Sequence, residues 1–119
     1  MDKALVVDDE IDICSLLVSQ LKNFGFQASY CLSVKAANAE LASNSYDLIF
    51  VDLNLTDGSG YELIHSLRAF DKTAKIIVIS AYEGERKKAL EVGGSLYIPK
   101  PFTKKTIREA LEKLNFLNN

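Results

Sequence analysis

Short apolar runs alternate along this chain with longer segments in which apolar residues recur every three or four positions. The longer spacing places apolar side chains on one face of a helix, whereas short runs rich in β-branched residues are typical of strands. The alternation is strict, so it predicts five strand–helix units. The expected strands are 3-KALVV-7, 27-QASYC-31, 48-LIFV-51, 76-IIVI-79 and 96-LYI-98.

Residues suited to helix ends flank the five expected helices. These are Gly25 after the first helix, Ser33 before the second, Ser59 near the start of the third, Gly93-Gly94 after a fourth that covers about 84–92, and Thr103 at the start of the fifth. The side chains expected to face the core are Ile13, Leu16, Leu17, Leu21 and Phe24; Val34, Ala37 and Leu41; Tyr61, Leu63, Ile64 and Leu67; and Ile107, Leu111 and Leu114.

The third and fourth expected strands are apolar at every position, which is typical of central strands covered by helices on both faces. Strict alternation and right-handed crossovers then predict an α/β fold, a three-layer domain with a doubly wound parallel sheet in the order 2-1-3-4-5. A single domain is expected to occupy residues 1–119, with a frayed tail at 115–119.

The composition is that of a soluble globular protein. The chain has 119 residues, of which 48% are hydrophobic and 25% are charged, and its net charge of −2 gives no reason to expect a nucleic-acid partner. Its apolar runs are too short to span a membrane, and Met1-Asp2-Lys3 leads straight into a strand, so no signal peptide is expected. Cys14 and Cys31 lack metal-type spacing and are expected to be buried free thiols, a pattern typical of the cytoplasm.

Reactive side chains follow four of the five expected strands. They are Asp8, Asp9 and Glu10 after the first strand, Asp52 after the third, Ser80 after the fourth and Lys100 after the fifth. In the order 2-1-3-4-5 the second strand is an edge, and the carboxyl ends of the other four converge where open α/β sheets bind ligands. We therefore expect these side chains to form one site.

The chemistry of such a site suits phosphoryl transfer. Clustered carboxylates repel one another, so at neutral pH they would share protons or hold a cation, and an open site with only oxygen ligands suits Mg²⁺. A lysine beside the cation would attract a phosphoryl group, to which Ser80 could donate a hydrogen bond and Asp52 could bond as a nucleophile. Taken singly, the residues leave other interpretations open: Asp8 and Asp9 could cap the first helix, and Lys100 could be a surface lysine. Asp57 is expected to shape the turn before the third helix rather than to bind a ligand.

Four stretches together resemble the receiver domain of two-component response regulators, a chemotaxis-regulator-like family with a flavodoxin-like (βα)5 fold. The stretches are 5-LVVDDE-10, 49-IFVDLNLTDGSG-60, 78-VISA-81 and 97-YIPKPF-102, and the resemblance covers essentially the whole chain. It implies that Asp52 is the phosphoacceptor, which takes a phosphoryl group from a sensor histidine kinase, a phosphotransfer protein or a small phosphodonor. Such a protein is not a conventional enzyme, because it catalyses only its own phosphorylation and dephosphorylation.

The resemblance also implies a ligand set for Mg²⁺. Asp9 would bind the ion directly and Asp8 would act through water. Asp52 and the backbone carbonyl of Asn54 would complete the protein ligands.

The resemblance assigns three further residues, Ser80, Lys100 and Tyr82, to contacts with the phosphoryl group and to its release. Ser80 and Lys100 would contact the phosphoryl group, and Lys100-Pro101 is expected to be a cis peptide bond. Tyr82, together with Asn54, would flank the attacking water and so modulate the lifetime of the phosphorylated form.

Phosphorylation is expected to act as a switch. Ser80 would move toward the phosphoryl group, the segment after it would follow, and Tyr97 would turn inward. The face made by the fourth helix, the fifth strand and the fifth helix would then bind a downstream protein, an effector domain or a second copy of the chain, because phosphorylation biases an existing equilibrium. Two basic groups on this face, 86-RKK-88 and Lys104, Lys105 and Arg108, are either a solvated surface or part of a partner-binding one.

The chain departs from the family pattern at two places. Thr56 replaces a usual proline, which would loosen the loop after Asp52, and the second glycine of 93-GGSL-96 would loosen the end of the fourth helix. One rival interpretation is a haloacid-dehalogenase-type phosphatase, whose D-x-D-x-T motif resembles 52-DLNLT-56, but Asn54 removes the general acid of that motif. A second rival is a receiver-like interaction module that no longer uses phosphate.

Overall fold

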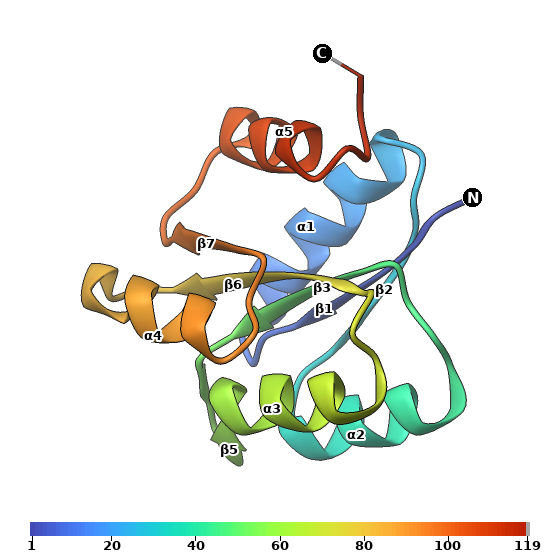
Figure 1. The fold of residues 1–119 in the computed structure, drawn as a ribbon. Helices are drawn as coiled ribbons and strands as arrows, with labels where there is room; N and C mark the ends of the chain where they lie inside the picture. The colour runs from blue at the N-terminus through green and yellow to red at the C-terminus, as the bar shows by residue number, and fades with distance from the viewer. Residues whose placement is uncertain (119) are drawn as a thin grey trace.

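A five-stranded parallel sheet forms the centre of the protein in a computed structural model that describes residues 1–118 (Figure 1). Its strands lie in the order β2-β1-β3-β6-β7, and two short strands, β4 (Asn54–Leu55) and β5 (Gly58–Ser59), form a separate hairpin. Counting only the central strands, this is the expected order 2-1-3-4-5, so the doubly wound α/β fold is confirmed. The central strands are β1 (Lys3–Val7), β2 (Gln27–Cys31), β3 (Leu48–Asp52), β6 (Lys75–Ser80) and β7 (Leu96–Pro99).

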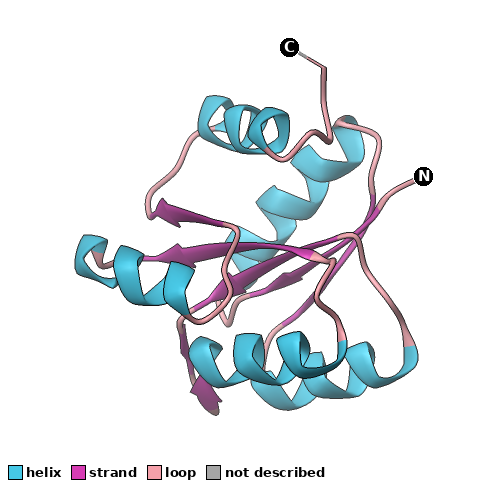
Figure 2. Ribbon diagram, viewed as in Figure 1, coloured by secondary structure: helices cyan, strands magenta, loops and turns pink. Residues whose placement is uncertain are grey.

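Helices cover both faces of the sheet, with α1 and α5 on one side and α2 and α3 on the other (Figure 2). Three of the expected helix starts are confirmed, because the side chains of Ser33, Ser59 and Thr103 each accept a backbone N–H of the helix that follows. The helices are α1 (Ile11–Asn23), α2 (Val34–Ser43), α3 (Gly60–Phe70), α4 (Arg86–Glu91), which follows a 3-10 turn at Glu83–Glu85, and α5 (Lys104–Lys113).

The sheet separates two apolar cores. The first lies under α2, α3 and α4 and includes Leu41, Leu63 and Ile64, and the second lies under α1 and α5 and includes Leu17 and Ile107. Strand β3 is buried along its whole length, and β6 is buried beyond its first residue. The interpretation of these two runs as central strands is therefore confirmed.

The apolar stripe of α1 differs from the expected one. Cys14, Leu17 and Leu21 are buried, whereas the side chain of Leu16 is 49% exposed. The helix turns Leu16 away from the sheet because its neighbour Leu17 already faces the core, and consecutive helical residues point about 100° apart. Cys14 is a buried free thiol, as expected, and takes the core position one turn before Leu17, whereas Cys31 is free but only partly buried.

Two side chains near the end of the chain, Phe116 and Leu117, pack against the second core, whereas Asn115 and Asn118 are exposed. The ring of Phe116 meets that of Phe26 edge to face, with 5.3 Å between centroids, and Leu117 lies against the same core. The backbone N–H of Phe116 donates to the carbonyl of Leu111. Asn119 lies outside the described residues.

The turn between α4 and β7 is closely packed. Gly93 has a φ of +122°, and a Cβ there would lie 2.9 Å from Cγ of Arg68. Arg68 in turn donates hydrogen bonds to the carbonyls of Gly93 and Ala74. A Cβ on Gly94 would lie 2.8 Å from the carbonyl oxygen of Ala89 and 2.8 Å from Cγ2 of Val78, so the two glycines let this turn lie close to α3, α4 and β6. Within residues 1–118, no helix combines the length and apolar content needed to cross a lipid bilayer.

Candidate functional site

The carboxyl ends of four neighbouring strands bring the expected polar residues to one edge of the sheet. Asp8 follows β1, Asp52 and Ser80 are the last residues of β3 and β6, and Lys100 follows β7. The backbone continues the sheet at this edge, because the N–H of Lys100 donates to the carbonyl of Ser80 over 2.7 Å. Asp8, Asp52 and Ser80 are buried, with 0%, 4% and 0% of their surface exposed.

The ammonium group of Lys100 lies among three carboxylates. Its Nζ is 2.8 Å from Oδ2 of Asp8, 3.1 Å from Oε1 of Glu10 and 3.4 Å from Oδ2 of Asp52. Burial by itself would lower the pKa of Lys100, but the hydrogen bond to Asp8 and the charges of Asp52 and Asp8 together raise it above its ordinary value. The side chain of Lys100 is therefore charged and fixed by its ion pairs, unlike that of a free surface lysine.

The pKa of Asp52 is raised as well, but for a carboxyl a raised pKa disfavours the charged form. Burial and, secondarily, the charge of Asp8 raise the pKa of its carboxyl, Lys100 opposes them, and the net result is a rise from 3.8 to about 6. One oxygen of Asp52 faces Lys100, and the other accepts the backbone N–H of Asn54 over 3.4 Å. The carboxylate is thus desolvated but keeps hydrogen-bond donors on both oxygens, which is a suitable environment for a nucleophile.

The acidic residues at the end of β1 form a cluster whose chemistry suits a hard cation. Asp8, Asp9 and Glu10 each offer a carboxylate oxygen, and these oxygens lie within 4.8 Å of one another. Oδ2 of Asp8 is buried and lies 2.8 Å from the Lys100 ammonium. A set of ligands that consists only of carboxylate oxygens fits Mg²⁺.

Glu10 lies in this cluster, as expected for a side chain of this site, although no separate role in metal or phosphoryl binding was predicted for it. The only sequence signal was its position directly after Asp8 and Asp9. The alternative that these acids cap α1 receives limited support, because the N-cap is Glu10 and its side chain makes no capping hydrogen bond. Asp8 accepts the N–H of Glu10 over 2.8 Å, which turns the chain into the helix.

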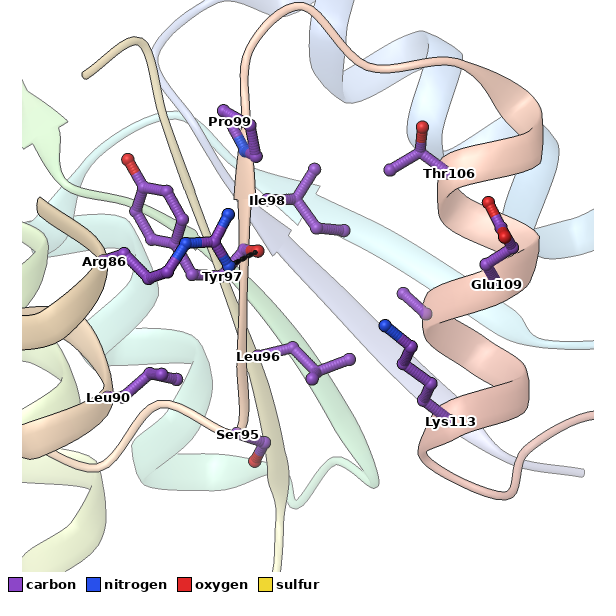
Figure 3. A pocket seen from close by; sticks show the side chains of 11 residues that line it. Arg86, Leu90, Ser95, Leu96, Tyr97, Ile98, Pro99, Thr106, Glu109 and Lys113 are labelled. Atoms are coloured by element: carbon purple, nitrogen blue, oxygen red, sulfur yellow. Dashed lines mark hydrogen bonds between the residues drawn. The ribbon is translucent and has the colours of Figure 1, made fainter. Parts of the chain in front are cut away.

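Ser80 and Tyr97 are connected through the segment that follows β6. Oγ of Ser80 accepts the N–H of Tyr82 over 3.1 Å, and the hydroxyl of Tyr97 donates to the carbonyl of Tyr82. Tyr97 is 5% exposed and already points inward, whereas Tyr82 is 62% exposed. The guanidinium of Arg86 lies 5.0 Å from the centre of the Tyr97 ring and donates to its carbonyl (Figure 3).

Asp57 has a function that the sequence did not indicate. Its carboxylate accepts the backbone N–H groups of Val34 and Lys35, the first two residues of α2. The expectation that Asp57 shapes the turn before α3 did not include this contact with α2. The partners are distant in the chain, and the local sequence, an aspartate before a glycine, indicates only a turn.

The geometry agrees with the comparison to known families. A family model for the response regulator receiver domain matches residues 4–112. The chain belongs to this family. The receiver domain also has the expected cis peptide bond between Lys100 and Pro101.

Relatives of known name support the same assignment. The receiver domain is 36% identical over 112 residues to the sensory transduction protein LytT of Enterococcus faecalis, and 33% identical over 116 residues to LytR of Staphylococcus epidermidis. These matches cover 92% and 95% of this chain but 46% of each relative, so the chain spans about half the length of the curated relatives it matches.

A solved structure extends the likeness to three dimensions. The response regulator TrrA of Thermotoga maritima, solved in complex with Mg²⁺ and BeF, superposes with a TM-score of 0.87 at 32% identity. The match covers 96% of this chain and 99% of that one. The local likeness of 52-DLNLT-56 to a phosphatase motif is therefore incidental, because the match to receiver domains extends over the whole fold.

Proposed function

We propose that this receiver domain accepts a phosphoryl group on Asp52 in a Mg²⁺-dependent reaction and acts as a switch in two-component signal transduction. The observation that carries the proposal is the position of the Lys100 ammonium, between the carboxylates of Asp8 and Asp52 at the convergence of the strands. Removing an ammonium group and two carboxylates from water offsets most of their mutual attraction, so this mostly buried arrangement is explained better by a function than by stability. TrrA, which was solved with Mg²⁺ and BeF, supports the choice of ligand.

Each side chain has a defined part in the proposed transfer. Asp8, Asp9 and Asp52, with the carbonyl of Asn54, would hold the metal, and Glu10 lies close enough to help orient the site. A bound Mg²⁺ would neutralise charge on the phosphoryl oxygens.

The bond changes occur between the phosphodonor and Asp52. An oxygen of Asp52 forms a bond to phosphorus while the bond from phosphorus to the donor's histidine nitrogen, or to the oxygen of a small acyl phosphate, breaks. Lys100 exchanges its contact with Asp52 for one with a phosphoryl oxygen, and the hydroxyl of Ser80 donates a hydrogen bond to another phosphoryl oxygen. Asn54 and Tyr82 border the phosphoryl site and would set the rate at which water removes the group.

The output surface is proposed to be the face of α4, β7 and α5. A cavity of about 310 Å³ lies there, and Figure 3 shows Arg86 and Leu90 from α4 facing Thr106, Glu109 and Lys113 from α5 across β7. A downstream protein, an effector domain or a second copy of the chain would bind this face, and a sensor histidine kinase or phosphotransfer protein would supply the phosphoryl group. We expect the domain to work in the cytoplasm, where such kinases present their phosphohistidine.

The decisive experiment is phosphorylation by a small donor. Wild-type protein, Asp52→Asn and the control Asp2→Asn, which alters an exposed acid at the other end of the sheet, are incubated with Mg²⁺ and acetyl phosphate. Intact-mass spectrometry should show one added phosphoryl group on the wild type and on Asp2→Asn, and none on Asp52→Asn. Chelation of Mg²⁺ should abolish the modification.

Two other results would contradict the proposal. Repeated turnover of generic phosphate esters would indicate a phosphatase. Absence of modification by acetyl phosphate, together with absence of a response to fluoroberyllate, would indicate an interaction module that does not use phosphate.

A further inference from the structure

The loop that follows Asp52 is attached at its tip to a different helix. Val34 N–H donates to Oδ1 of Asp57 over 2.8 Å, and Lys35 N–H donates to Oδ2 over 3.0 Å. Both donors belong to the first turn of α2, whose N-terminal dipole favours a negative charge. Asp57 therefore caps α2 from outside, while Ser33 caps the same helix end from within its own segment, by accepting the N–H of Ala36.

The path of the loop is restricted beside this attachment as well. A Cβ on Gly58 would lie 3.2 Å from Cγ2 of Val34, so the loop backbone lies directly against the start of α2. Leu55 is 8% exposed and anchors the hairpin in the first core. At the far end a Cβ on Gly60 would lie only 2.3 Å from the carbonyl oxygen of Asp52, so α3 begins in contact with the phosphoacceptor's own backbone.

The same loop contains the groups that face the reacting carboxylate. Asn54 N–H donates to Oδ1 of Asp52, and its carbonyl is the proposed metal ligand. Gly60 N–H closes the loop by donating to the carbonyl of Leu53 over 3.0 Å. Thr56, at the tip, supplies none of the backbone restriction that a proline would. The link from Asp57 to α2 is what restricts the tip instead.

We propose that Asp57 is a positioning residue for metal binding and phosphoryl transfer at Asp52. By capping α2 it holds residues 53–59 so that the Asn54 carbonyl and the Asp52 carboxylate keep their relative placement. This inference rests on the proposed function, and Asp57 itself touches no reacting atom. Asp57 also couples the N-terminus of α2 to the site, so that a change in the stability of either one alters the stability of the other.

The first test needs no metal. Hydrogen exchange of the backbone N–H groups of Asn54 and Gly60 is followed by NMR in Asp57→Ala, with Ser33→Ala as the matched control. Both variants remove a side-chain cap from the same helix end, but only Asp57→Ala releases the loop. In Asp57→Ala, hydrogen exchange at these two groups should become faster than the change in global stability alone would explain. In Ser33→Ala, any increase in the exchange rate should be fully explained by the change in global stability.

The second test measures Mg²⁺ dependence. The Mg²⁺ concentration that gives half-maximal fluoroberyllate binding should rise about tenfold in Asp57→Ala, the size of effect seen when a group supporting a metal ligand is lost. It should stay within about twofold of wild type in Ser33→Ala. For Asp57→Asn, which keeps one acceptor oxygen, the half-maximal Mg²⁺ concentration should lie between those of Asp57→Ala and Ser33→Ala.

The outcomes separate the two proposals. A wild type that responds to Mg²⁺ and fluoroberyllate, with an unchanged midpoint in Asp57→Ala, overturns the positioning role alone. Equal shifts in Asp57→Ala and Ser33→Ala overturn it too, because they indicate a general effect of the α2 cap. A wild type that does not respond overturns the proposed function and the positioning role together.

Discussion

The carboxylate of Asp52 lies in surroundings that oppose its negative charge. It is 4% exposed, Asp8 lies near it, and Lys100 is 3.4 Å away, so burial and a like charge outweigh one favourable ion pair. A group in this position is under electrostatic stress that phosphoryl transfer or cation binding would relieve. The stress is a property of the folded state, and it can be measured without any ligand.

Replacing this charge should stabilise the protein at neutral pH. The folded chain holds the proton of Asp52 more tightly than the unfolded chain, since burial raises its pKa from 3.8 to about 6. Ionisation therefore costs stability as the pH rises through that interval. In chelator-containing buffer, Asp52→Asn should raise the free energy of unfolding by about 2 kcal/mol near pH 7, and the gain should nearly vanish near pH 4.

Urea unfolding at several pH values measures this difference directly. Asp2→Asn, at an exposed position, should show little change over the same range. A gain for Asp52→Asn that is the same near pH 4 as near pH 7 would mean that packing, not charge, causes it.

At the residue scale, position at a strand end made the reactive groups predictable. Asp8, Asp52, Ser80 and Lys100 follow buried strands whose parallel arrangement could be inferred, so their convergence followed from topology. Asp57 could not be predicted, because its partners at α2 lie more than twenty residues earlier and the contact depends on the three-dimensional path of a loop.

At the scale of elements, local chemistry determined what could be predicted. Ser33, Ser59 and Thr103 were recognisable because a capping side chain bonds within its own first turn. The β4-β5 hairpin, with two residues in each strand, is too short to show a hydrophobic period. Leu16 was misplaced because α1 is apolar over more than one face, and only packing decides which side chains are buried.

The segment between β6 and α4 is held around Tyr97 by three contacts. The Tyr97 hydroxyl bonds the carbonyl of Tyr82, Arg86 covers the ring and bonds its carbonyl, and the hydroxyl of Tyr61 on α3 donates to Glu85. The inward position of Tyr97 thus belongs to a connected set of elements, α3, α4 and β7. Under the proposed switch this is the conformation that phosphorylation favours.

Loss of Arg86 should weaken that conformation. Arg86→Ala removes the group that covers Tyr97, so the ring should sample outward positions more often, and fluoroberyllate should bind about threefold to tenfold more weakly through the linkage between site and switch. Calorimetric titration in the presence of Mg²⁺ measures the affinity. Lys87→Ala, which removes a neighbouring exposed positive charge, is the control and should bind as the wild type does.

At the scale of the whole molecule, the sheet joins the two cores into one structure. The side chains of β1, β3 and β6 alternate between the two, so that Leu5 and Ile49 belong to the core under α2 and α3, while Ala4 and Leu48 belong to the core under α1 and α5. Neither layer of helices can lose its contacts without exposing one face of strands that are otherwise buried. We therefore propose that the chain unfolds as a single domain.

Core substitutions on opposite faces test this. Leu17 and Leu63 lie in different cores and are 0% and 2% exposed, so Leu17→Ala and Leu63→Ala should each lower the free energy of unfolding by about 2–5 kcal/mol. Far-ultraviolet circular dichroism and tyrosine fluorescence should report one coincident urea transition in each variant. Separate transitions, with the helices around the altered core unfolding first, would show that the sheet does not couple its two faces.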